Sequence, residues 1–227
     1  RRDILPDDIV IALSKLQDQV KPFSTAQARA MIEAALDEPI SKAFTRFDEA
    51  PLASASIAQV YGATLPSGED VIVKVLRPDI NHQVEQDLAI LKWGAYWLSA
   101  LSKSLRRLNL KSVTLELERT LLEELDLIKE AANASQLRRN FKDRDGLHIP
   151  KIYWSYCRKN ILVMERIYGI PILNKQELIN RGFDLKNVGE RGVTLFYTQV
   201  FEDSFFHADL HPGNLFINPE TKKHPEW

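Results

Sequence analysis

The order of the predicted elements most limits the folds open to this chain. β-Rich stretches lie between Phe47 and Leu76, where Pro66-Ser67-Gly68-Glu69 separates two of them and predicts an antiparallel turn. Two long helical patterns follow, over Pro78 to about Leu105 and over Ser112 to about Phe141. Two short strands are then expected at Ile152–Tyr156 and Asn160–Ile167, and two further helices at Gln176–Arg181 and Leu185 to about Ser204. A small antiparallel sheet with inserted helices therefore precedes a helical part.

Apolar residues recur at helical spacing from Pro6 to about Phe47, with Pro22 between two groups of them. Two helices are therefore expected ahead of the sheet. The predicted organisation is a helical N-terminal extension over residues 1–46, a sheet-rich lobe with inserted helices over 47–167, and the start of a helical lobe over 168–227.

The charge balance excludes one broad class of partner. The 227 residues include 30 basic and 31 acidic side chains, so no overall positive field favours nucleic acid. Any charged site must therefore be local.

The single cysteine, Cys157, excludes an internal disulfide and is expected to be a small packed residue in a strand region. No stretch approaches the roughly 20 apolar residues that span a bilayer.

The C-terminal loop carries the strongest chemical pattern, His-x-Asp-x-x-x-x-Asn, with Asp209 five residues before Asn214. In kinase-type phosphoryl transfer the aspartate orients the substrate hydroxyl and the asparagine holds a metal ion that neutralises phosphates. Asp and Asn are also common turn residues, and Pro212-Gly213 is a turn signal. A metal hydrolase built on His207, Asp209 and His211 is a weaker alternative, because no further ligand cluster accompanies them.

Two earlier segments predict a phosphate site. Lys74 lies near the end of a β-rich stretch, where its ammonium suits the α- and β-phosphates of a nucleotide; the alternative is an edge-strand lysine that faces water. About twenty residues earlier, the small-residue loop Ala53-Ser54-Ala55-Ser56 stands where a kinase carries glycines. Its alanines make a positive φ costly. An ordinary strand edge of small residues is the competing interpretation.

Acidic residues on the helix from Ser112 offer partners for Lys74. They are Glu123, Glu124, Asp126 and Glu130. On one continuous helix Glu124 and Glu130 lie about 240° apart, so at most one of them is the simple partner, and a solvated acidic face is the alternative. Further along, backbone groups of Glu165 and Ile167 are candidates for binding an adenine.

A basic cluster follows the helix that carries Trp93 and Trp97. Its members are Lys103, Arg106, Arg107 and Lys111. The first expectation is a solvated turn beside a packed helix. The alternative is contact with anionic lipid.

These segments, in this order, resemble the UbiB family of atypical kinase-like proteins over nearly the whole chain. The phrases that carry the resemblance are PLASASIAQV, VIVKVLRPDI, EELDLIKEAANA, MERIYGIPI and FFHADLHPGN. The resemblance implies an α+β, two-lobed protein-kinase-like fold, cut short. It makes Lys74 the phosphate-binding lysine, Glu124 and Asp126 the family's Glu-x-Asp pair, Asp209 the catalytic aspartate and Asn214 a magnesium ligand. It also implies an alanine-rich nucleotide loop made of Leu52, Ala53, Ser54, Ala55, Ser56, Ile57, Ala58, Gln59 and Val60.

The cofactors implied are ATP or ADP and magnesium, and the implied role is an atypical kinase or ATPase that supports ubiquinone biosynthesis. The resemblance further implies a prenyl-lipid precursor and other ubiquinone-biosynthesis proteins as partners, and a location on the cytoplasmic side of the bacterial inner membrane. The family's Lys-x-Gly-Gln motif, its Asp-x-Gly motif and its membrane segments are expected outside these 227 residues, so we expect little turnover from this chain alone. The alternatives are a non-catalytic nucleotide-dependent scaffold and a small-molecule kinase of aminoglycoside or choline type, against which the alanine-rich loop argues.

Overall fold

The computed structural model describes residues 22–101, 109–142, 144, 146–205 and 212–219. The chain forms two compact units, and each takes parts from separate stretches of sequence. The first comprises the residues up to Lys129 together with Trp154–Val163, and the second comprises Glu130–Tyr153 and the residues from Met164 onward. The chain therefore passes from one unit to the other three times.

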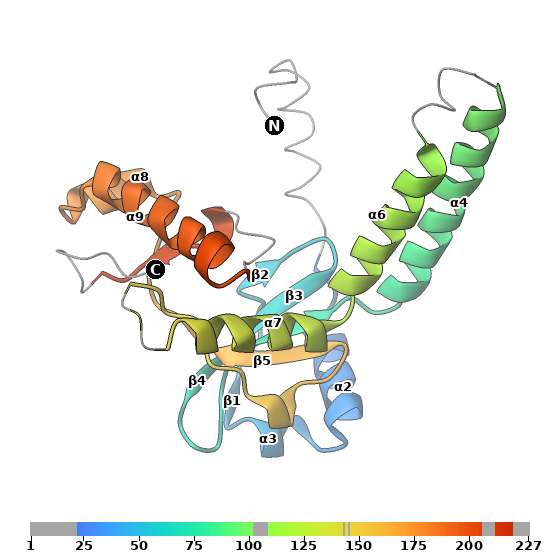
Figure 1. The fold of residues 1–227 in the computed structure, drawn as a ribbon. Helices are drawn as coiled ribbons and strands as arrows, with labels where there is room; N and C mark the ends of the chain where they lie inside the picture. The colour runs from blue at the N-terminus through green and yellow to red at the C-terminus, as the bar shows by residue number, and fades with distance from the viewer. Residues whose placement is uncertain (1–21, 102–108, 143, 145, 206–211, 220–227) are drawn as a thin grey trace. The chain divides into compact units, whose positions relative to one another are not determined.

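An antiparallel sheet organises the first unit (Figure 1). Its strands are β1 (Arg46–Phe47), β2 (Ala53–Ser54), β3 (Ala58–Thr64), β4 (Asp70–Leu76) and β5 (Ile161–Glu165), whose last two residues belong to the second unit. The order is β1-β3-β4-β5, and β2 pairs with the same β3 further along. Gly68, with φ of +96°, makes the predicted turn between β3 and β4 possible without the cost that a Cβ would bring. The predicted small antiparallel sheet is confirmed.

One face of this sheet makes the core of the first unit. Val71, Val73 and Val75 alternate along β4 and are fully buried. Two short helices precede the sheet, α2 (Thr25–Leu36) and α3 (Ile40–Ala43). Helix α2 begins with a complete capping box between Ser24 and Gln27 and buries Ala28, Ile32 and Leu36. The expected earlier helix lies outside the described residues.

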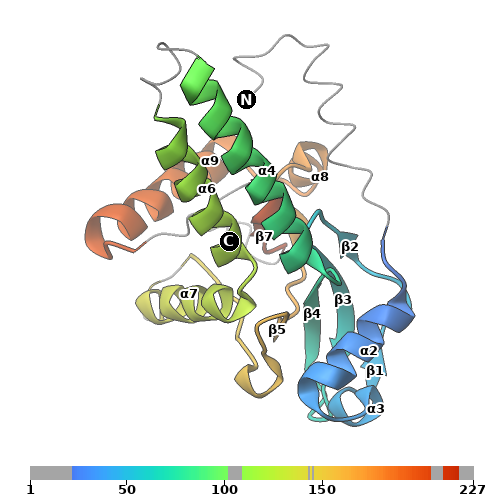
Figure 2. The same ribbon diagram turned by 90° about the vertical axis from the view of Figure 1, so that its right-hand side faces the viewer.

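Two long helices of the first unit lie side by side, α4 (Ile80–Leu101) and α6 (Leu110–Glu124) (Figure 2). The expected single helix from Ser112 to Phe141 is wrong, because α6 ends at Glu124 and α7 (Leu127–Asn140) begins three residues later. The Asp126 carboxylate accepts a hydrogen bond from the Ile128 N–H, and the Leu127 N–H donates to the Lys159 carbonyl. These contacts divert the backbone donors that a continuous helix would use.

A second expectation also fails, since Ile152–Tyr156 is not a strand. Ile152 forms only an isolated bridge to Met164. Trp154–Tyr156 is a 3-10 turn, in which the Cys157 N–H donates a hydrogen bond to the Trp154 carbonyl. The aromatic residues favour β structure, but this local hydrogen bond competes with strand pairing. Cys157 itself is buried, as expected.

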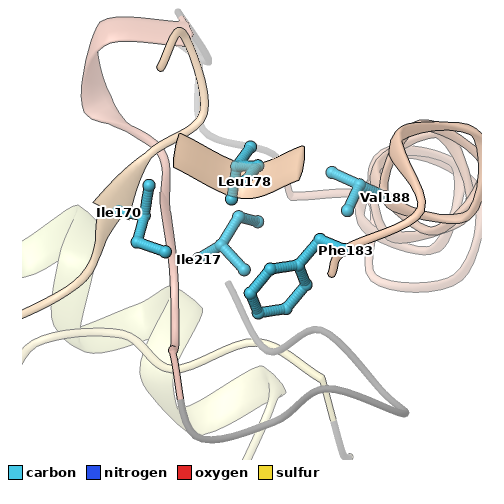
Figure 3. Close-up of a cluster of buried hydrophobic side chains, with 5 residues drawn as sticks. All are labelled: Ile170, Leu178, Phe183, Val188 and Ile217. Atoms are coloured by element: carbon cyan, nitrogen blue, oxygen red, sulfur yellow. The ribbon is translucent and has the colours of Figure 1, made fainter. Parts of the chain in front are cut away.

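The second unit is mainly helical, with α8 (Lys175–Asn180), α9 (Leu185–Tyr197), a π-helical turn at Thr198–Glu202 and a two-stranded sheet of β6 (Ile170–Pro171) and β7 (Phe216–Ile217). Five buried side chains, shown in Figure 3, join these elements: Ile170, Leu178, Phe183, Val188 and Ile217. Gly169 allows the two strands to approach, because a Cβ there would lie 2.9 Å from the Phe216 Cβ atom. In the described part of the chain no helix has the length and apolarity needed to cross a membrane.

Candidate nucleotide site

Three residues of neighbouring strands form a row across the first unit's sheet. Ala53 of β2 is paired with Val60 of β3, and Val60 is paired with Lys74 of β4. Residues directly opposite each other in antiparallel strands point to the same face. The row therefore puts the side chains of Ala53, Val60 and Lys74 on the same face of the sheet, with Val60 between the other two.

Lys74 does not lie on an edge strand. Strand β4 runs between β3 and β5, and the side chain of Lys74 is partly buried. Val73 and Val75 on either side point into the core, so Lys74 points to the opposite face. Because β4 is not an edge strand, the alternative of an edge-strand lysine is wrong. The phosphate role of Lys74 stays a prediction.

Residues 52–60 form a tight β-hairpin. Its turn is closed by the Ala55 N–H, which donates to the Ala58 carbonyl over 2.9 Å, and none of these nine residues has positive φ. The ladder with β3 makes the segment a strand edge, as the competing interpretation proposed, and it also stands in the row with Lys74. Ser54 and Ala55 at the turn are exposed.

Arg77 holds this turn in place, and the sequence reasoning missed it. Its Nε and Nη2 atoms donate to the Ala55 carbonyl oxygen over 3.1 and 3.0 Å, and Nη2 also donates to Ser54 Oγ over 3.1 Å. The Arg77 N–H donates to the Ile57 carbonyl. A forked guanidinium suits such convergent acceptors, and its position three residues after Lys74 is the one signal that could have revealed it.

The predicted acidic residues fall in different places. Glu124 is the exposed last residue of α6, and Asp126 caps the first turn of α7. Both belong to the first unit, as does Lys74, whereas Glu130 lies in the first turn of α7 and belongs to the second unit. The break between α6 and α7 removes the argument that Glu124 and Glu130 lie 240° apart, because that argument assumed one helix.

Glu165 ends β5 and its side chain has three partners within the second unit. Oε2 accepts from the Lys151 N–H over 2.9 Å and lies 3.6 Å from Arg138 Nη1, while Oε1 lies 3.0 Å from His148 Nε2. The Glu165 N–H donates to the Lys151 carbonyl and cannot also serve an adenine. Of the expected backbone contacts, the Glu165 carbonyl and the groups of Ile167 therefore stay as candidates.

Asn214 is exposed and ends a 3-10 turn formed by Pro212–Asn214. The Ile172 N–H donates to the Leu215 carbonyl, and Ile217 is paired with Ile170, so the β6–β7 ladder fixes the chain just after Asn214. Asp209, His207 and His211 lie outside the described residues. Among those described, no group of three His, Cys, Asp or Glu side chains could hold a metal ion.

The mixed fold, with a lysine in an inner strand behind a small-residue hairpin, has the architecture of an atypical kinase. The ABC1 atypical kinase-like domain family matches residues 15–224, and the chain belongs to this family. A solved structure, the complex of Rv3197 with erythromycin from Mycobacterium tuberculosis, has a similar fold. It aligns with a TM-score of 0.69 and 23% identity over 95% of this chain and 54% of that one.

Curated relatives match the whole chain and carry the name "Probable protein kinase UbiB". The protein from Azotobacter vinelandii is 51% identical over 227 residues, and the protein from Pseudomonas aeruginosa PAO1 is 49% identical. The match covers all of this chain in both cases, but only 42% and 43% of the relatives. The chain therefore spans less than half the length of the curated relatives it matches, and the resemblance to the UbiB family is confirmed.

Proposed function

We propose that this chain forms the nucleotide-binding part of an atypical kinase or ATPase and binds ATP or ADP with magnesium. The row of Ala53, Val60 and Lys74 carries the proposal, because the cationic side chain of Lys74 and the small side chain of Ala53 point to the same face of one sheet. An ammonium beside small side chains suits phosphate oxygens, which need charge and close approach.

Each predicted residue then has a role. Lys74 binds the α- and β-phosphates, and residues 52–60 cover them in a shape held by Arg77. Asp209 orients the attacking hydroxyl or water, and Asn214 holds magnesium, which neutralises phosphate charge when it is bound. Glu130, or the pair Glu124 and Asp126, supplies the acidic partner of Lys74 or of the metal ion.

Membership of the UbiB family supports a role for this chemistry in ubiquinone biosynthesis. We propose that the whole protein acts with other enzymes of that process on, or close to, a prenyl-lipid precursor at the cytoplasmic side of the bacterial inner membrane. The sequence relatives named as UbiB support this assignment.

Calorimetric titration with MgATP and MgADP tests the binding site. Lys74→Ala should remove measurable nucleotide affinity, because it deletes the phosphate charge while leaving the strand intact. Lys42→Ala is the matched control, since Lys42 is an exposed lysine that pairs with Glu38, four residues earlier. Equal affinity in Lys74→Ala and the wild type would contradict the assignment of Lys74.

A second measurement separates an enzyme from a nucleotide-dependent scaffold. ATP hydrolysis by a full-length relative should be lost when the residue equivalent to Asp209 becomes Asn, whereas nucleotide binding should persist. Cells that carry this change should accumulate an early ubiquinone precursor. Precursor accumulation with unchanged hydrolysis would favour the scaffold.

A further inference from the structure

Helix α4 carries apolar residues on two opposite sides. Leu88 and Ala95 face inward and are buried. Ile90, Trp93, Trp97 and Leu101 recur at helical spacing on another face and are solvent-exposed, with Trp93 at 67% and Leu101 at 79%. A helix that is apolar on both sides normally lies inside a core or against an apolar partner phase.

The exposed face continues with aromatic and aliphatic residues. Trp97 packs edge-on against both Trp93 and Tyr96, with ring centroids 6.2 and 5.9 Å apart. On the neighbouring α6 no residue is buried, and Val113 and Leu115 in its first half are exposed. The expectation that the Trp93 and Trp97 helix is packed is therefore wrong for its outer side.

Charge is segregated along these two helices. No Asp or Glu occurs between Asp87 and Glu116, although five basic residues do: Lys92, Lys103, Arg106, Arg107 and Lys111. The acidic residues lie in the first half of α4 and from the middle of α6 onward: Glu85, Asp87, Glu116, Glu118, Glu123 and Glu124. Because α4 and α6 are antiparallel neighbours, both acidic ends lie near the sheet, and the acid-free ends lie away from it (Figures 1 and 2).

We propose that the acid-free half of the α4–α6 hairpin, defined by Ile90, Trp93, Tyr96, Trp97, Leu101, Lys111, Val113 and Leu115, binds the surface of an anionic lipid bilayer. Trp and Tyr favour the boundary between hydrocarbon and head groups, and lysine and arginine are attracted to anionic head groups. A protein partner is less well matched, because lysine is depleted at protein interfaces. The inference does not depend on nucleotide binding, and it assigns membrane contact to this chain itself.

Vesicle sedimentation of the 227-residue chain tests the apolar part of the surface. The wild type should bind vesicles of phosphatidylcholine mixed with phosphatidylglycerol, and the double variant Trp93→Ala/Trp97→Ala should bind at least about tenfold more weakly, since two large rings are lost from the interface. Trp154→Ala is the control, because Trp154 is also about half exposed but lies outside the hairpin. It should bind like the wild type.

A separate variant tests the contribution of the basic residues to vesicle binding. Lys111→Glu should weaken binding to the mixed vesicles about fivefold or more, because each basic group near an anionic surface contributes to attraction. Lys42→Glu, an exposed lysine on α3, is the control. Added salt should weaken binding of the wild type, and pure phosphatidylcholine vesicles should bind it less well than the mixed vesicles.

Three results of the vesicle assays would overturn the proposal. They are no binding by the wild type, equal binding to neutral and anionic vesicles, and unchanged binding by the tryptophan variant. Analytical ultracentrifugation without lipid tests whether a second copy of the chain covers this face instead. A dimer that dissociates in Trp93→Ala/Trp97→Ala would show that it does, and the lipid assignment would be wrong.

Discussion

The Arg144 guanidinium binds the Asp203 carboxylate, with 2.9 Å between Nη1 and Oδ1. The same side chain lies 3.5 Å from Glu202 through Nη2 and stands over the Phe141 ring. Asp203 is 8% exposed, and its Oδ2 atom has no hydrogen-bond partner in the described part of the chain. Arg144 thus connects the segment after α7 to the end of the π-helical turn, six residues before Asp209.

Arg144→Gln should lower the free energy of unfolding by about 1–2 kcal/mol, because it leaves a nearly buried carboxylate without its cation. The lower end of that range reflects the partial exposure of Arg144. Hydrogen exchange should quicken at the Asp203 and Phe205 N–H groups, which donate to Thr198 and Gln199. Urea denaturation and amide exchange measure the two effects.

The matched control is Arg181→Gln, because Arg181 forms an exposed pair with Glu177 at the C-terminal end of α8. Its effect on stability should stay below about 0.5 kcal/mol. Equal losses in the two variants would mean that the Arg144 pair behaves as an ordinary surface contact.

Gly146→Ala should destabilise the protein more than Gly182→Ala. Both glycines have positive φ, at +103° and +84°, so both variants bear the backbone cost of about 1–2 kcal/mol. At Gly146 an added Cβ would also lie 2.9 Å from Arg191 Cζ, whereas Gly182 faces open space. Thermal denaturation of both variants tests this, and adding Arg191→Ala to Gly146→Ala should recover the extra loss. No recovery would exclude crowding as its cause.

Ala55→Gly should change the relative affinities for ATP and ADP while costing less than about 1 kcal/mol of stability. Alanine restricts the covering hairpin, and glycine adds freedom mainly to the unfolded chain and to the turn. Since Ala55 adopts an ordinary negative φ, the fold should survive. Ala53→Gly should act in the same direction. Calorimetric titrations with both nucleotides and melting curves decide, and unchanged preference in both variants would leave the hairpin an ordinary strand edge.

The Cys157 thiol makes one contribution to stability that depends on pH. Burial raises the pKa of Cys157, and its sulfur is near the Val163 backbone. An acid whose folded-state pKa is raised contributes stability that is lost as pH rises above the unfolded value, here about 8.5. Between about pH 8 and pH 10 the wild type should therefore lose more unfolding free energy than Cys157→Ala. Urea denaturation at several pH values checks the difference, and parallel losses would contradict it.

Local patterns predicted the elements that depend on neighbouring residues. The turn around Gly68 and the alternation of Val71, Val73 and Val75 predicted the β3–β4 hairpin, and the spacing of apolar residues predicted α4. The row from Ala53 to Lys74 was partly predictable, because Ala53 and Lys74 were both candidates for the same nucleotide site. The strand register that pairs each of them with Val60 could be read only from the structure.

Contacts between distant residues decided the remainder. The end of α6 depends on the Leu127 N–H, whose acceptor Lys159 lies far along the chain, and no helical pattern contains that information. Arg77 likewise has a role only because the turn at Ala55 folds back toward it. The exposure of Trp93 on the outer side of α4 was not predicted, because apolar residues in a helix are normally expected to be buried.

Three passages of the chain between the two units have a consequence for dissection of the protein. The boundary falls within α7, before Trp154 and within β5. Residues up to Lys129, expressed alone, would lack Ile161–Val163, so β4 would become a sheet edge with unpaired backbone groups and a tendency to self-associate. Neither lobe can be exchanged between relatives as one continuous cassette, and chimeras must exchange at least two separate stretches together.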